Sequence, residues 1–121
     1  MSSNEITVVK GSAPLDWGEI PQEPGNPRPP AYETVEHRSG DGRFAVGFWK
    51  RDPEEGEMSL TEFHEVMFIL EGEVEITAED GTVHNVGSGD LVIAPQHCRG
   101  TWKALTPVRK VWTIYREFPE S

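Results

Sequence analysis

Two ionisable residues stand beside apolar stretches, where their chemistry would differ from that of surface charges. Glu65 is followed by the apolar run Val66–Leu70, and Lys110 alternates with Val108 and Trp112 in a β-type segment. A carboxylate and an ammonium group in a water-poor cavity can act as acid and base on a small polar substrate, or can hold one that carries an amine or a carboxylate. The same two groups can also form a structural ion pair that fills the interior. The residues themselves leave both interpretations open.

Tryptophan is the second concentration of chemically useful side chains, at positions 17, 49, 102 and 112. The indole offers a large flat apolar face and one N–H donor, so it often lines ligand pockets. We expect Trp102 and Trp112 to be pocket walls. Trp17 and Trp49 are expected to be core or interface residues.

Nucleophilic catalysis has weaker support. Cys98 lies between His97 and Arg99, which favour the thiolate, but adjacency in sequence does not orient a base on a thiol. His64 and Glu65 are neighbours in a predicted strand and therefore face opposite sides. No glycine-rich loop opens a helix, so the nucleotide-binding fingerprints are absent.

Short β-type segments separated by turn residues must position these side chains. Glycine-containing turns at 39–42, 79–81 and 87–90 supply the positive-φ positions that hairpins need, and no segment is typical of a helix of three turns. The pattern predicts an all-β sandwich, jelly roll or small barrel. The expected strands are Thr34–His37, Arg43–Arg51, Met58–Thr61, Glu65–Leu70, Glu73–Ala78, Thr82–Val86, Asp90–Ile93, Arg99–Ala104 and Val108–Arg116.

Residues 1–31 are predicted to be an extended, proline-rich N-terminal arm, followed by one barrel domain over residues 32–121. Six prolines between Gly11 and Ala31 remove backbone donors, so this stretch cannot be a helix or a central strand. Leu15, Trp17 and Ile20 give it apolar anchors, and we expect it to lie against the barrel. A disordered leader is the alternative.

The composition of the 121 residues excludes several classes of protein. With 11 basic and 21 acidic side chains, the formal charge of −10 repels phosphate backbones and anionic lipids, so neither a nucleic acid nor a membrane is an expected partner. No apolar run approaches the roughly 20 residues of a membrane-spanning helix. One cysteine and no secretory signal pattern predict a cytoplasmic protein.

Several predicted strands are apolar on both faces. In the last one, Lys110, Trp112 and Ile114 share one face, and Val111, Thr113 and Tyr115 share the other. A small domain usually covers a second apolar face by pairing with another copy, so we expect a homodimer.

The segment from Gly56 to Tyr115 resembles the cupin superfamily, most closely the small cupins of the ureidoglycine-aminohydrolase-like and ethanolamine-utilisation group. Gly56, Glu65 and Gly72 keep the spacing of the first cupin motif, and Gly89–Pro95 matches the second. Phe48-Trp49, Gly100-Thr101-Trp102 and 108–112 match details of this group. The positions that hold metal-binding histidines in cupins are here Ser59, Thr61 and Gly100.

This resemblance implies a cupin double-stranded β-helix, that is, a jelly-roll barrel open to a ligand at one end. The side chains that would point inward are Ser59, Thr61, Glu65 and Met67. Lys110 would form an ion pair with Glu65. One carboxylate and two hydroxyls do not satisfy a transition metal, so no metal and no cofactor are expected. A weak site that includes His97, Cys98 or other residues remains an alternative.

The sequence therefore predicts a metal-independent small cupin that binds a small polar or nitrogen-containing metabolite. Glu65 and Lys110 would be the catalytic pair, if the protein is an enzyme, in an isomerisation, deamination or hydrolysis. The expected substrate-binding residues are Ser59, Thr61, Met67, Trp102 and Trp112. One rival is a non-catalytic ligand-binding or assembly cupin with a filled barrel; another is a metal-dependent enzyme, similar to ureidoglycine aminohydrolase, with non-standard ligands.

Overall fold

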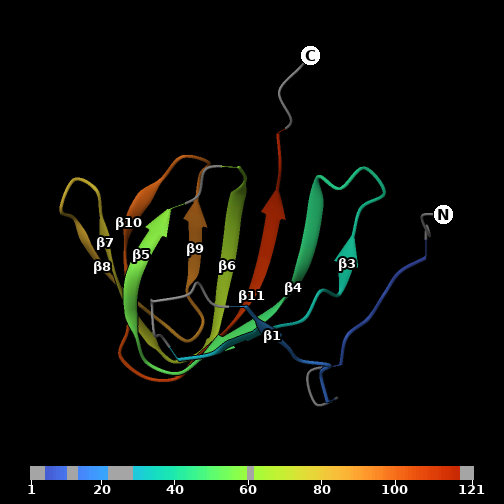
Figure 1. The fold of residues 1–121 in the computed structure, drawn as a ribbon, viewed down its shortest axis with the longest axis horizontal. Coiled ribbons are helices and arrows are strands. Elements are labelled where there is room, and N and C mark those ends of the chain that lie inside the picture. Colours follow the sequence, from blue (N-terminus) through green and yellow to red (C-terminus); the bar gives the residue numbers. More distant parts are fainter. Residues whose placement is uncertain (1–4, 11–13, 22–28, 60–61, 118–121) are drawn as a thin grey trace.

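The computed structural model describes residues 5–10, 14–21, 29–59 and 62–117, and they form two antiparallel sheets. The larger sheet has the order β1-β2-β4-β11-β6-β9, with β3 also paired to β4, and the smaller has the order β5-β10-β7-β8. In Figure 1 the sheets converge at the lower end of the view and spread apart at the upper end. No helix occurs in these ranges, so none of them holds a helix that could cross a membrane. The predicted all-β jelly-roll barrel is confirmed.

The strands follow the predicted alternation of β-type segments and turns. Their bounds are β1 Gly18–Ile20, β2 Ala31–Glu33, β3 His37–Arg38, β4 Phe44–Arg51, β5 Glu55–Ser59, β6 His64–Glu71, β7 Glu73–Ala78, β8 Val83–Gly87, β9 Leu91–Ala94, β10 Arg99–Ala104 and β11 Val108–Tyr115. The segments predicted at 73–78 and 99–104 match in full, and five others differ by one residue at one or both ends. The strand predicted at Met58–Thr61 instead begins at Glu55 and ends at Ser59.

The predicted strand Thr34–His37 is wrong. Residues 34–36 are irregular, and two shorter strands, β2 and β3, flank them. The backbone N–H of Thr34 still donates to the Phe48 carbonyl at 2.9 Å, and that of Glu36 donates to the Val46 carbonyl at 2.8 Å. The segment therefore stays beside β4 without regular pairing, which β-propensity alone does not reveal.

Part of the predicted arm joins the larger sheet. Gly18–Ile20 pairs with Ala31–Glu33, which in turn pairs with the end of β4. Trp17 lies beneath the Lys50 ammonium, 4.3 Å from its ring centroid. β1 is an edge strand of the larger sheet, and Pro21, which follows it directly, lies outside the pairing.

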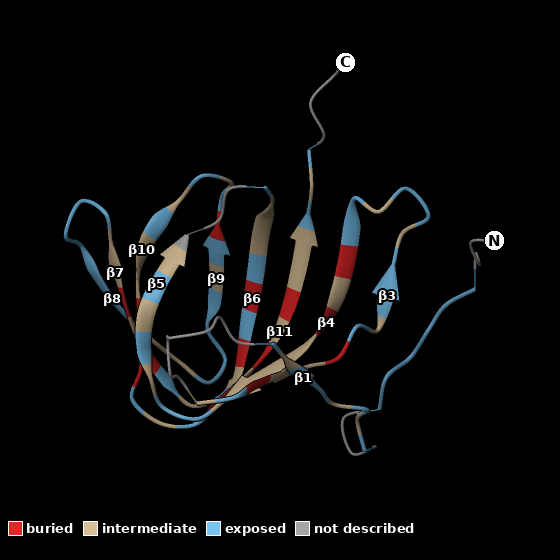
Figure 2. Cartoon of the chain, viewed as in Figure 1, coloured by how far each residue is buried: buried red, intermediate tan, exposed pale blue. Residues whose placement is uncertain are grey.

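The core lies between the facing sides of the two sheets. It consists of Met67, Ile69, Val74, Ile76, Ala94, Trp102, Ala104 and Val108, each nearly inaccessible to solvent. In Figure 2, buried positions alternate with exposed ones along β6 and with intermediate ones along β11 and the first half of β4, as expected for strands with one face toward a core. Gly72 closes the β6–β7 turn with a φ of +104°, and a Cβ there would collide with the Pro107 carbonyl.

Candidate functional site

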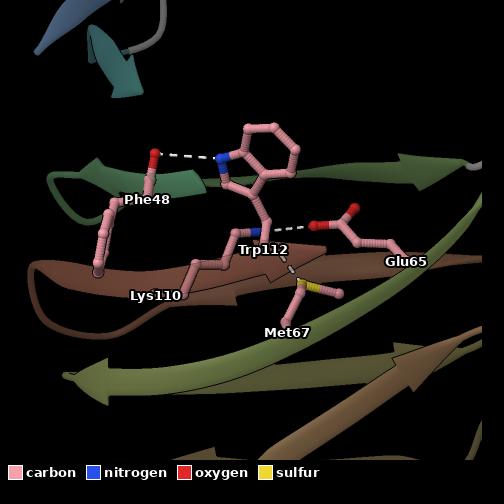
Figure 3. Close-up of polar contacts among 5 residues, drawn as sticks. All are labelled: Phe48, Glu65, Met67, Lys110 and Trp112. Carbon is pink, nitrogen blue, oxygen red and sulfur yellow. Dashed lines mark hydrogen bonds and ion pairs between the residues drawn. The ribbon is translucent and has the colours of Figure 1, made fainter. Parts of the chain in front are cut away.

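Glu65 and Lys110 both face the barrel interior from neighbouring strands. Along β6 the inward side chains are Glu65, Met67 and Ile69, and the register places Ile69 opposite Lys110 and Ile114 opposite Glu65. The long lysine side chain bridges that offset, and its Nζ donates to Glu65 Oε2 at 3.2 Å (Figure 3). β11 runs toward the open end in Figure 1 and β6 is antiparallel to it, so Glu65 lies toward that end. The structure thus brings together the two residues that the sequence singled out.

The Lys110 ammonium lies in an enclosed, electron-rich setting. Its Nζ is 3.0 Å from Met67 Sδ, 4.6 Å from the Trp49 ring centroid and 4.9 Å from that of Trp102. Ring faces attract a cation, and the Glu65 carboxylate attracts it further. Burial nevertheless lowers the pKa of Lys110, an effect that the Glu65 charge opposes and the Arg51 charge reinforces.

The pair is buried but borders empty space. Only 10% of the Lys110 side chain and 13% of the Glu65 side chain are exposed to solvent. Both line a cavity of about 190 Å³ that Trp102, Met67 and Met58 also border, called here the tryptophan cavity. Both also line a cavity of about 330 Å³ that contains Ile20 of β1, called the arm-side cavity. A carboxylate and an ammonium group therefore stand between two spaces that could receive a small molecule.

The two predicted tryptophan walls have different roles in the structure. The Trp112 indole N–H donates to the Phe48 carbonyl at 3.1 Å, and the ring lines the arm-side cavity. Trp102 lines the tryptophan cavity, and its indole N–H is buried with no partner among the residues that the structure describes. A buried donor without an acceptor is uncommon in proteins and marks a place where a ligand or water oxygen would be favourable.

Sequence reasoning missed Trp49 and Arg51 at this site. Trp49, expected in the core or an interface, meets the Trp102 ring edge-on at 5.9 Å and lines both cavities. Arg51 lines the tryptophan cavity and is paired with Glu54 at 2.9 Å. Trp49 is opposite Lys110 in the β4–β11 register, and that register cannot be read from either strand alone.

The family of the chain follows from a sequence comparison that covers this site. The family model of the EutQ-like cupin domain matches residues 38–112, which include β4, β6, β10 and most of β11. The chain belongs to the EutQ-like cupin family. The predicted cupin resemblance is thereby confirmed, and the two buried residues lie within the matched segment of this EutQ-like cupin.

Solved structures of cupins share this fold. The EutQ protein of Clostridium difficile is 18% identical over 78% of this chain and 75% of its own, with a TM-score of 0.65. A DUF861 family protein of Thermotoga maritima is 40% identical over 54% of this chain and 73% of its own, with a TM-score of 0.51. Ectoine synthase from P. lautus is 18% identical over 73% and 65% of the two chains, with a TM-score of 0.64. No match is found among proteins with curated functions.

Two predicted binding residues of the cupin lie at the edge of what the structure describes. Thr61 is outside the described residues. Ser59 ends β5 and its backbone is opposite Arg99, but its side chain is not described. Met58 is opposite Gly100, and its side chain packs against the core.

The residues present do not fit a cupin metal centre. Across the described ranges, no group of three His, Cys, Asp or Glu side chains converges as a metal ion requires. At Gly100, the position of a metal-binding histidine in cupins, a Cβ would lie 2.5 Å from the Thr77 carbonyl oxygen, so this backbone accepts no side chain there. His64 Nδ1 accepts the Gln96 backbone N–H at 3.0 Å.

The environment of Cys98 determines whether its thiol could act as a nucleophile. It is half-buried, and burial raises the pKa of its thiol, with a further rise caused by the Glu65 charge. A thiol with a raised pKa is a poor nucleophile, so the environment does not support covalent catalysis by Cys98.

Proposed function

We propose that this EutQ-like cupin binds a small polar or nitrogen-containing metabolite at the Glu65–Lys110 pair without a metal ion, and performs acid/base chemistry on it. The observation that carries the proposal is a buried ion pair that lines two cavities. A structural ion pair would be packed on all sides, since interiors are close-packed. An isomerisation, deamination or hydrolysis needs one group to take a proton and another to deliver one, and Glu65 and Lys110 are such groups.

The walls of the cavities suit a small, partly polar ligand. Trp49, Trp102 and Met67 supply apolar surface, and Lys110, Arg51 and Glu65 supply charges of both signs. Thr61 and Ser59 are proposed as further binding residues from the cupin resemblance alone. The empty volumes argue against the rival of a filled barrel, and the donor set described above favours chemistry without a metal.

A thermal-shift screen with small polar metabolites, including ureido, amide and amine compounds, tests the proposal. Ligands of the site should stabilise the wild type by mass action and lose this effect in Glu65→Gln. Glu71→Gln is the matched control, because Glu71 is on the same strand and pairs with Arg109 outside these cavities. Any turnover found with such a ligand should disappear in Glu65→Gln. Equal stabilisation of wild type and Glu65→Gln would contradict the assignment.

Metal independence needs its own test. Chelator-treated protein should bind the same ligands as untreated protein. Elemental analysis that finds about one transition metal per chain, together with loss of ligand binding after chelation, would overturn this part of the proposal.

The proposed assembly is a homodimer formed by the outer face of the larger sheet. Its exposed apolar residues are Phe44, Val66, Phe68, Leu91, Ile93 and Tyr115. The outward positions between them, Phe48, Val111 and Thr113, are also uncharged, although the chain as a whole has a formal charge of −10. This uncharged part of the face, which excludes Lys50 and the Arg109–Glu71 pair, can meet its own copy without like-charge repulsion. Light scattering should give twice the chain mass, and Phe68→Lys should give the monomer; a monomeric wild type would contradict the proposal.

A further inference from the structure

An apolar cleft of about 290 Å³ lies between two strand edges that do not pair with each other. β8 ends the smaller sheet, β9 ends the larger one, and the cleft runs between them. Its apolar lining includes Ile76, Ala78, Val86, Val92, Ala94 and Pro95. The ionisable side chains that border it are exposed His84 and Arg99 and half-buried Cys98. Apolar surface of this kind is available to an apolar group.

The cleft adjoins the tryptophan cavity. Met58 lines both, and its side chain has three rotatable bonds, so a change of its rotamer would alter the separation between the two spaces. The β6–β9 register places Glu65 opposite Ala94, which lines the cleft. The Glu65 charge also contributes to the raised pKa of the Cys98 thiol in the same lining. The polar pair and the apolar cleft are thus neighbouring parts of one interior.

We infer that the barrel takes an amphipathic small molecule, with its polar head at Glu65 and Lys110 and a short apolar arm in the cleft between β8 and β9. This inference rests on the proposed function, because the head is held by the pair assigned there. The kind of ligand follows from the two linings. A molecule with only a polar head would leave the apolar cleft exposed to water. A purely apolar molecule would displace water from the ion pair without replacing the hydrogen bonds that the water makes.

The size of the effect follows from the burial of apolar surface. Each methylene group moved from water into the cleft should tighten binding about fourfold. The gain should stop once the arm exceeds the length that the cleft accommodates.

A chain-length series measured by titration calorimetry tests the inference on the whole chain of 121 residues. The probes are straight-chain carboxylates, primary amides and primary amines with two to six carbons. Three variants accompany the wild type. Val86→Thr introduces a hydroxyl into the cleft without a change of shape, and Val83→Thr is the control on the same strand, because Val83 is exposed and does not line the cleft. Glu65→Gln removes the charge at the head.

The expected result is binding by one head class that tightens with chain length in the wild type and in Val83→Thr. The gain per methylene should shrink in Val86→Thr, and all binding should be lost in Glu65→Gln. Binding that depends on Glu65 but not on chain length would overturn the inference and leave the proposed function standing. Length-dependent binding that survives Glu65→Gln would overturn it too, because the cleft would then act alone. If no probe of any head class binds, both proposals fail.

Discussion

Two ion pairs join the same two strands, β11 and β6, and they differ in almost every property that matters for function. Arg109 and Lys110 are consecutive residues, so they face opposite sides of the sheet. Arg109 reaches Glu71 at 2.7 Å with side chains 37% and 65% exposed, whereas Lys110 reaches Glu65 at 3.2 Å with side chains 10% and 13% exposed. The shorter contact is the one in solvent, where its energy is small. Burial, not distance, distinguishes the pair that can do chemistry.

Replacing one cation at a time tests most directly whether the two ion pairs contribute differently to stability. Lys110→Met should cost about 3–5 kcal/mol in the free energy of unfolding, because it leaves the Glu65 carboxylate buried without a counter-charge. Arg109→Met should cost about 0–1 kcal/mol, the usual range for an exposed pair. Urea denaturation followed by circular dichroism measures both. Equal costs would mean that the interior pair is as well hydrated as the exterior one.

Removing both interior charges separates stability from function. In Glu65→Met/Lys110→Met, apolar side chains replace the pair, and the double variant should recover about 1–3 kcal/mol relative to Lys110→Met alone. The same variant should lose every ligand of the site. The corresponding exterior variant, Glu71→Met/Arg109→Met, should show no recovery of that size and should keep the ligands. A stable double variant that still binds ligand would show that the pair is structural.

The pair could be anticipated from the sequence because each member carries its own local evidence. Glu65 has cupin spacing to Gly56 and Gly72, and Lys110 lies in a strand whose face is otherwise apolar. The all-β class followed in the same way from turn residues between short strands. Both inferences need information from only one segment at a time.

The rest of the site depends on register between segments that are far apart in the chain. Trp49 reaches Lys110 because β4 pairs with β11 in one particular register, and a shift by one residue would turn the tryptophan to the outer face. The irregular stretch Thr34–Glu36 was predicted as a strand for the same reason: only its partner, β4, shows that regular pairing stops there. The apolar cleft likewise exists because β8 and β9 end different sheets. The sequence of either strand alone does not predict this arrangement.

The dependence of stability on alkaline pH should also differ between the two ion pairs. The folded protein holds the pKa of Lys110 below its ordinary value of 10.5, chiefly through burial. Between the lowered pKa and 10.5, the unfolded chain binds more protons than the folded one, so the free energy of unfolding should rise with pH. The rise cannot exceed about 1.4 kcal/mol per pH unit for one proton. Denaturation from pH 7 to 10.5 should show it as a difference between wild type and Lys110→Met. Arg109→Met should follow the wild type, since a guanidinium stays protonated throughout.

The smallest expected effect uses Cys98 to distinguish the charge of Glu65 from that of Glu71. Burial is the main reason that the pKa of the Cys98 thiol is raised, and the Glu65 carboxylate adds to it by disfavouring a second negative charge. Glu65→Gln should therefore lower that pKa and accelerate alkylation by iodoacetamide a few-fold at pH 8, because the thiolate is the reactive form. Glu71→Gln should leave the rate unchanged, since its charge is outside the barrel and screened by solvent. Equal acceleration by both variants would mean that Cys98 senses the net charge of the chain, and the interior pair would lose its distinction as a local electrostatic centre.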